Sequence, residues 1–419
     1  MLRHFFEIGS DPALFDELQI AAESDLCTSH QGQYPVISIS LKGTAGLDFD
    51  EAIASLASIV RAEALRHQYL MQSDRLSTYD KLELEPLLLS ELPKDKLQQS
   101  ILLLTRLLHI HHNQKVVVLI DEYDVPLAKA FEYGYYDSMV MLIRNTLHQA
   151  LKTNDHLQFA VLTGCMRIAK ESIFTGLNNL RIHSITSNQF DEYFGFTDAE
   201  VKKMLSYYAL DLQYASVKTW YDGYQFGGMS VYCPWDVINY IADLRYDPLM
   251  PPKNYWSNTS SNDIIRRFLD KADDTTRWEL EQLIEGKSIE KIVYNELTYA
   301  EVDKTIDHLW SVLLTTGYLS GRSVNQSRPP ATYESFGSGL LSNTLMLKIP
   351  NEEIRSIFKN HIYSWFNDHV ETDAQRYQTF TQAFIDGNSQ QIQDMFSAYL
   401  METISIRDTS VGNCNSKLQ

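Results

Sequence analysis

The chain has 419 residues, the length of two or three ordinary domains, and its 44% hydrophobic and 21% charged composition is typical of a globular protein with a sizeable core. A net charge of -18 excludes attraction of the whole surface to nucleic acid, although a local basic groove remains compatible with it. No apolar run is long enough for a transmembrane helix, the N-terminus does not resemble a signal peptide, and the four cysteines are scattered. We therefore expect a cytoplasmic protein with reduced thiols and no membrane partner.

The first part of the chain predicts helices around one short strand. Tyr34–Leu41 is rich in β-branched residues and predicts the strand. Apolar residues at helical spacing predict helices on either side of it. These predicted helices span residues 1–9, 12–23, 48–72, 83–91 and 94–112.

Strands become more frequent further along. The uninterrupted apolar run Val116–Ile120 is typical of a strand buried on both faces of a parallel sheet. A helix is expected at 138–152, a second strand at 159–163 and a weaker third strand at 181–186. Strands and helices that alternate in this way predict an α/β core with a parallel sheet.

Beyond residue 188 aromatic residues are dense and strands are few. Thr197 and Glu200 form the pattern of a capping box, which predicts a helix over 197–209. Residues 318–320 and 344–349 are expected to pair as a hairpin with an exposed wing between them. The remaining predicted elements are helices at 262–272, 276–285, 351–368 and 373–401, and a short strand followed by a helix between 286 and 317.

Two adjacent acids, Asp121 and Glu122, follow the buried strand. In open α/β sheets, ligands bind beyond the carboxyl ends of the strands. A carboxylate there suits Mg²⁺, which prefers oxygen ligands, and a second one can polarise a water that attacks a phosphate. Asp121 is thus the candidate metal ligand, directly or through water, and Glu122 the candidate base. The alternative interpretation is that these acids only cap the next helix.

The second strand ends in Leu162-Thr163-Gly164 and is followed by Arg167. Thr163 is placed to contact the attacking water or a γ-phosphate, and Arg167 to stabilise developing phosphate charge. Taken by itself, this pattern also describes a strand that ends in a turn with a solvated cation.

Other clusters have structural interpretations. His109, His111 and His112 are favourable cations at a helix C-terminus, whereas a metal site would need two or more of them to converge with further ligands. The aromatic stretch Trp220–Gly227 is suited to base stacking, but few cations surround it, which favours packing around a tight turn. No Gly-x-x-x-x-Gly-Lys-[Ser/Thr] loop occurs, since Glu281 replaces the first glycine before Gly286-Lys287-Ser288.

Several stretches resemble the bacterial AAA-ATPase-like family, P-loop NTPases that often carry a C-terminal PD-(D/E)XK nuclease domain. The resemblance spans nearly the whole chain. The stretches that carry it are Tyr34–Gly43, Val117–Leu127, Leu162–Gly164 with Arg167–Asn179, Trp220–Phe226 with Val231–Trp235, Tyr255-Trp256 with Thr259-Ser260, Leu314–Leu319, and Ile349–Glu353.

The resemblance implies an incomplete ATPase core over 1–187, a helical lid over 188–283, a winged-helix-like region over 284–372 and a helical tail over 373–419. It implies ATP and Mg²⁺ as cofactors, Asp121 and Glu122 as the Walker B acids, and Arg167 as a sensor or finger. The family's Walker A loop and nuclease domain have no counterpart here, so we expect a chain truncated at both ends with little or no hydrolysis alone. The alternative is a non-catalytic regulatory or DNA-associated module that uses the winged-helix-like region, with DNA or another protein as its partner.

Overall fold

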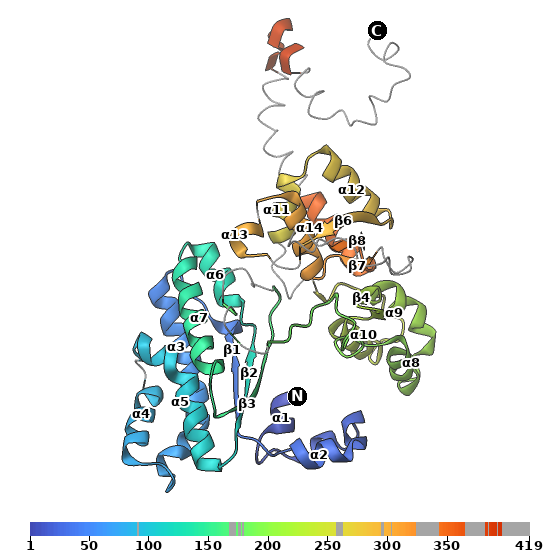
Figure 1. The fold of residues 1–419 in the computed structure, drawn as a ribbon. Coiled ribbons are helices and arrows are strands. Elements are labelled where there is room, and N and C mark those ends of the chain that lie inside the picture. The colour runs from blue at the N-terminus through green and yellow to red at the C-terminus, as the bar shows by residue number, and fades with distance from the viewer. Residues whose placement is uncertain are drawn as a thin grey trace, which may run out of the picture. The chain divides into compact units, whose positions relative to one another are not determined.

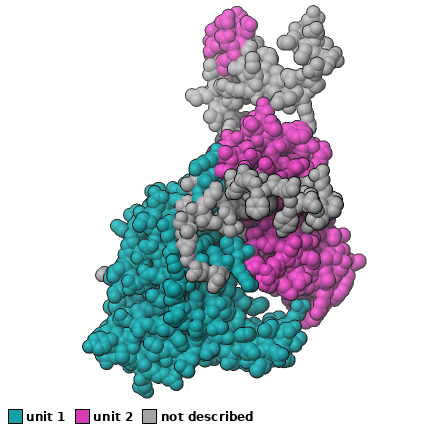
Figure 2. Space-filling model, viewed as in Figure 1, with its two compact units in different colours: residues 1–182, 295–304 teal, residues 183–294, 305–419 magenta. Residues whose placement is uncertain are grey.

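The computed structural model describes residues 1–89, 92–166, 173–174, 177, 180–256, 263–294, 297–302, 304–323, 343–364, 382–383, 385–391 and 393–395. The chain forms two compact units, which Figure 2 colours separately. Unit 1 comprises residues 1–182 and 295–304, and unit 2 comprises residues 183–294 and 305–419.

Unit 1 is built on a parallel sheet of three strands in the order β1-β2-β3. These strands are β1 (Val36–Ser40), β2 (Val116–Asp121) and β3 (Leu157–Leu162). The register pairs Ser40 with Asp121 and Ile120 with Leu162, so the three carboxyl ends lie at one edge. The expected mixed α/β architecture with a parallel sheet is confirmed.

Helices cover this sheet on both faces (Figure 1). Helices α3 (Phe49–Arg66), α5 (Lys94–His112) and α7 (Tyr136–Leu151) form a layer on one side. On the other side, Phe6 of α1 (Leu2–Phe6) packs edge-on against Tyr34 and Phe159. Alternate side chains of each strand point to opposite faces, so the continuous apolar sequence of β2 fills both layers.

Shorter helices complete unit 1. They are α2 (Ser24–His30), α4 (Thr78–Leu88), α6 (Val125–Tyr133) and α13 (Tyr299–Val302), with 3-10 turns at Pro12–Phe15, Gln19–Ala22, Leu41–Gly43 and Gln68–Gln72. The single helix predicted over 12–23 is wrong, because two 3-10 turns occupy that segment. Of these two turns only Phe15 is buried, so the segment has no continuous apolar face to support an α-helix.

The third strand predicted over 181–186 is also wrong. Residues 181–184 have no regular secondary structure, and residues 185–186 form a turn. The carbonyl of Ile185 accepts from the Gly227 amide, 2.8 Å away, in the turn of a hairpin. Ile182, one of its two apolar side chains, is exposed.

The described residues of unit 2 combine helices with two small antiparallel sheets. Its helices are α8 (Asp198–Tyr207), α9 (Tyr214–Tyr221), α10 (Pro234–Leu244), α11 (Asp263–Lys271), α12 (Asp274–Ile284), α14 (Ile306–Thr315) and helical residues 352–364. Its strands are β4 (Tyr224–Phe226), β5 (Met229–Val231), β6 (Ile289–Val293), β7 (Ser320–Ser323) and β8 (Asn343–Lys348).

Two predictions for unit 2 are confirmed. Thr197 and Glu200 form the expected capping box at the start of α8. Strands β7 and β8 pair antiparallel, and the sheet order is β6-β8-β7. The wing expected between these strands and the helix expected at 373–401 lie largely outside the described residues. Within the described part of the chain, no helix is long and apolar enough to cross a membrane.

The histidines at the end of α5 are held by hydrogen bonds in unit 1. His111 Nδ1 lies 2.7 Å from Ser73 Oγ, and His112 Nε2 lies 2.9 Å from the Tyr69 hydroxyl. His109 Nδ1 lies 2.8 Å from His156 Nδ1. Burial, followed by the neighbouring His111, lowers the pKa of His112 to about 4, and burial also lowers the pKa of His111 and His156.

Because these pKa values are lower in the folded protein than in the unfolded chain, unit 1 should lose stability as the pH falls below about 6.5. After allowance for the partial exposure of the rings, we expect the free energy of unfolding to fall by about 1 kcal/mol between pH 7 and pH 5 through His112. Urea unfolding at both pH values measures this. The variant His112→Gln should show a smaller loss, whereas His4→Gln, at an exposed site outside the network, should behave as the wild type.

Candidate functional site at the carboxyl edge of the parallel sheet

One side chain from each strand end meets at the carboxyl edge of the sheet in unit 1. The Asp121 carboxylate accepts from the Thr163 hydroxyl through Oδ1 and from the Ser40 hydroxyl, 3.4 Å away, through Oδ2. All three residues are solvent-exposed. The result is a row of oxygen atoms across β1, β2 and the end of β3, open to solvent.

Glu122 leaves the strand in a conformation that non-glycine residues rarely adopt. Its φ is 55°, in the left-handed region, which costs a residue with a side chain about 1–2 kcal/mol. Beyond it, the Tyr123 amide donates to the Thr163 carbonyl over 3.0 Å. Such strain is concentrated at functional sites, which makes Glu122 a candidate on geometry as well as on sequence.

Electrostatics at Glu122 make its carboxylate a stronger base than an ordinary one. Partial burial, then the charges of Asp124 and Asp121, raise the pKa of its carboxyl, and the Lys42 ammonium opposes that rise. A carboxylate with a raised pKa accepts a proton more readily than an ordinary one.

Asp124 is buried and anchors the loop that follows β3. Its Oδ2 accepts from the Met166 amide at 2.8 Å and from the Tyr299 hydroxyl at 3.4 Å, and its Oδ1 accepts from the Cys165 amide at 3.2 Å. Burial raises the pKa of this carboxyl, while these donors and its own amide oppose the rise. Asp124 is therefore a positioning residue that joins the loop after β2 to the loop after β3.

Gly164, in the loop after β3, lies directly against Tyr123 and Asp124. A Cβ atom built on it would lie 2.6 Å from Tyr123 Cε1 and 2.7 Å from Asp124 Oδ1. The Tyr123 hydroxyl is fixed in turn, since it donates to the Met166 carbonyl over 2.7 Å. The loop can approach β2 this closely only because residue 164 has no side chain.

The structure thus brings Asp121 and Thr163 into contact and places Glu122 beside them. Arg167 lies outside the described residues. Asp124 is the N-cap residue of α6, but its side chain makes no cap hydrogen bond. Gly286, in the stretch with partial Walker A character, follows α12 at a φ of 87° and forms a turn.

Three residues of this site were not identified from the sequence. Ser40 was part of a predicted strand, yet its position at that strand's carboxyl end was a usable signal. Lys42 follows in a 3-10 turn and is exposed. Asp124 stands two residues before Pro126, a position that suggests a helix start rather than a buried carboxylate that binds a distant loop.

The site is rich in oxygen atoms and suits a hard cation. Among the residues that the structure describes, no group of three or more His, Cys, Asp or Glu side chains could hold a metal ion by itself. Mg²⁺ does not need such a group, because it keeps several waters and binds through one or two carboxylates together with phosphate oxygens. Asp121, with the Ser40 and Thr163 hydroxyls beside it, offers this kind of site.

Comparison with known families agrees with this geometry. Residues 1–174 match the model of the AAA-ATPase-like family, described as a predicted AAA-ATPase. Over these residues the chain is similar to the AAA-ATPase-like family. The match contains all three strands of the sheet and the acids at its edge.

A protein of Azotobacter chroococcum mcd 1, described as an uncharacterized protein in the vnfD 5' region, is 30% identical over 159 residues. The matched stretch covers 38% of this chain and 30% of that relative. No solved structure matches the chain.

The close contacts of Gly164 lead to a test of the loop. We expect Gly164→Ala to lower the free energy of unfolding by about 1–3 kcal/mol, because the new methyl group overlaps Tyr123 and Asp124. The matched control is Gly43→Ala, since a Cβ atom at Gly43 would meet nothing within 4 Å. Equal melting temperatures for the two variants would show that the loop after β3 is not packed as described.

Proposed function

We propose that unit 1 is the nucleotide-binding core of an ATPase, with Asp121 as the metal-binding acid and Glu122 as the base. The observation that carries this proposal is the row of Ser40, Asp121 and Thr163 across the sheet's carboxyl edge, together with the family match over the same residues. In this assignment Asp121 holds Mg²⁺ directly or through water, and Thr163 contacts the attacking water or the γ-phosphate. Bound Mg²⁺ would neutralise phosphate charge, and Glu122 would orient and deprotonate the water.

Within the described part of the chain no strand pairs with the outer edge of β3, which offers a place for a further strand. The residues of β3 are half-buried or exposed along its whole length, whereas most residues of β1 are buried. An apolar edge strand of this kind can pair with an additional strand. We propose that this edge is where a strand leading to a Walker A loop would pair, beside Thr163 and Asp121.

The 419 residues contain no Walker A loop. Without it, no nest of backbone amides and no lysine cradles the β- and γ-phosphates. We therefore propose weak nucleotide binding and little or no hydrolysis by this chain alone. Arg167 remains a candidate for stabilising phosphate charge, and the cytoplasmic location and the nuclease association stay predictions from the sequence.

For unit 2 we propose a winged-helix-like region. Its support is the chain order α12, β6, α14, β7, β8 and the antiparallel order β6-β8-β7. Helix α14 would take the place of a recognition helix, but it contains no Lys or Arg, and Leu309, Trp310 and Leu313 on it are fully buried. Since DNA binding depends on exposed cations, this helix favours a structural role over the DNA-associated alternative.

A calorimetric titration with Mg²⁺-ATP tests the nucleotide site. We expect weak binding, with a Kd on the order of 1 mM, that requires Mg²⁺ and is lost in Asp121→Asn. The control Glu132→Gln changes an exposed acid of the same unit that pairs with Lys129 and should bind as the wild type. Binding that is indifferent to Mg²⁺ and to Asp121→Asn would contradict the assignment.

An ATPase assay on the same proteins tests the proposal that this chain alone hydrolyses little or no ATP. We expect no phosphate release above background, because the Walker A contacts are absent. Turnover that disappears in Glu122→Gln would show that the chain hydrolyses ATP after all, and it would identify Glu122 as the base. The genomic sequence directly upstream adds a second observation, since an in-frame Gly-Lys-Thr codon run there would supply the loop.

Titration of the chain with duplex DNA at about 50 mM and about 200 mM salt tests the alternative that the chain is a DNA-associated module. Because α14 lacks cations, we expect no binding whose affinity falls steeply with salt. A fall of about 10³-fold or more between the two salt concentrations would indicate several phosphate contacts and favour the DNA-associated function.

A further inference from the structure

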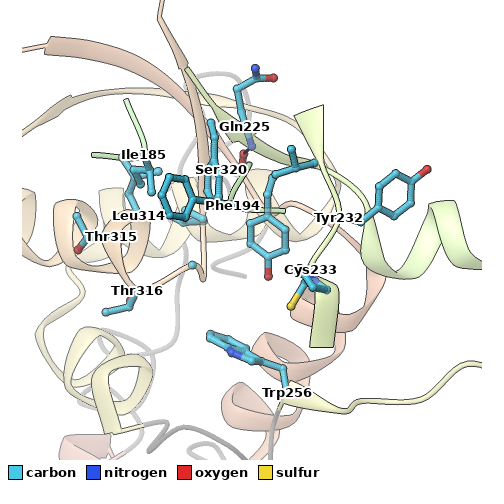
Figure 3. A pocket seen from close by; sticks show the side chains of 16 residues that line it. Ile185, Phe194, Gln225, Tyr232, Cys233, Trp256, Leu314, Thr315, Thr316 and Ser320 are labelled. Carbon is cyan, nitrogen blue, oxygen red and sulfur yellow. Dashed lines mark hydrogen bonds between the residues drawn. The ribbon is translucent and has the colours of Figure 1, made fainter. Parts of the chain in front are cut away.

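Unit 2 contains a cavity of about 230 Å³ with largely apolar and aromatic walls (Figure 3). Its lining includes Phe194, Tyr224, Tyr232, Cys233 and Trp256, with Thr315 and Thr316 from the end of α14. Figure 3 shows Cys233 and Trp256 near one another at one end of the cavity. Both of these residues are linked to a buried pair of acids just behind the wall.

The pair consists of Asp236, in the first turn of α10, and Glu353, in the first turn of helical residues 352–364. Both are fully buried, with 0% exposure. Glu353 Oε1 accepts from the backbone amides of Tyr255 at 2.5 Å and Trp256 at 2.9 Å. Glu353 therefore fixes the segment that carries Trp256 to the cavity wall.

The other three carboxyl oxygens of the pair lack strong hydrogen-bond donors when both acids are ionised. Apart from the Cys233 thiol, a weak donor beside Asp236, neither Asp236 oxygen nor Glu353 Oε2 then has a hydrogen-bond partner among the described residues. The hydrogen bond between the two carboxyl groups exists only while one of them carries a proton. Two buried carboxylates without a compensating charge repel each other strongly, so the pair keeps one proton between them.

Among the residues that the structure describes, no cation near the pair takes the place of that proton. Arg355, on the same helix as Glu353, pairs with Glu352, and Lys253 pairs with Asp243. The Cys233 thiol lies against Asp236. The other described titratable groups near the pair are the phenols of Tyr221, Tyr224, Tyr240 and Tyr255. Burial raises the pKa of each phenol and of the Cys233 thiol, so all of these groups are neutral near pH 7.

We propose that the proton shared by Asp236 and Glu353 is a latch that holds the Tyr255–Trp256 segment against the cavity, so that the cavity wall opens as the proton concentration falls. The latch is a device of unit 2 and does not depend on nucleotide binding in unit 1.

The direction of the pH effect follows from linkage. Burial and the Asp236 charge raise the pKa of Glu353 to about 8 in the closed form. In an open, hydrated form the same carboxyl has an ordinary pKa near 4.3. Opening therefore releases one proton, so its equilibrium constant should rise about tenfold for each pH unit between about 5 and 8 and level off above 8.

Hydrogen exchange of the Tyr255 and Trp256 amides measures this opening. After correction for the intrinsic pH dependence of exchange, we expect their protection to fall about 100-fold between pH 6 and pH 8 and then to stay constant. The Tyr232 amide, which donates to the Phe196 carbonyl at 2.8 Å, is the internal control and should show no such slope. Protection of Tyr255 and Trp256 that is independent of pH in the wild-type protein would overturn the proposal.

Two substitutions locate the proton. In Asp236→Asn an amide N–H replaces the shared proton, and in Glu353→Gln the side-chain amide can donate to Asp236, so each variant should stay latched with flat protection from pH 6 to 9. Either variant suffices if the other fails to fold. Glu352→Gln is the matched control, because it removes the neighbouring acid outside the pair and should keep the wild-type slope. An unchanged slope in Asp236→Asn or Glu353→Gln would show that the proton lies elsewhere.

Discussion

The site in unit 1 depends on the contact of two hydroxyl groups with the carboxylate of Asp121 at the end of a buried strand. In a parallel sheet all carboxyl ends point the same way, so residues far apart in sequence meet at one edge. Ser40 and Asp121 are 81 positions apart, and Asp121 and Thr163 are 42 apart, yet they form one row. Any shift in the register of β2 would separate them.

Much of this arrangement could be predicted from sequence because the signals are local. The run Val116–Ile120 is apolar without interruption, which is typical of a strand covered on both faces. The acids after it were then placed at the sheet's edge by the geometry of parallel strands alone. Helix α8 was predictable for a similar reason, since a capping box involves only Thr197, Glu200 and the amides between them.

Other features depend on contacts that no local pattern encodes. Helix α6 was missed, although Pro126 in its first turn and Gly134 at its end, with a φ of 82°, are recognisable boundary signals. The segment 181–186 has the composition of a strand but finds no strand to pair with. Asp124 resembles a cap in the sequence, while its actual partners, Cys165 and Met166, are about 40 residues away. The acids Asp236 and Glu353 belong to helices more than 100 positions apart and meet only when unit 2 is folded.

The buried acids of the two units show that burial alone does not decide what a carboxyl group does. Asp124 is as deeply buried as Asp236, but two backbone amides and a phenol donate to it, so it serves as a rigid anchor. Asp236 has the Glu353 carboxyl in front of it and no amide or hydroxyl donor. A buried acid with a full set of donors fixes a loop, whereas one that faces another acid must keep a proton, and its contacts then change with the proton concentration.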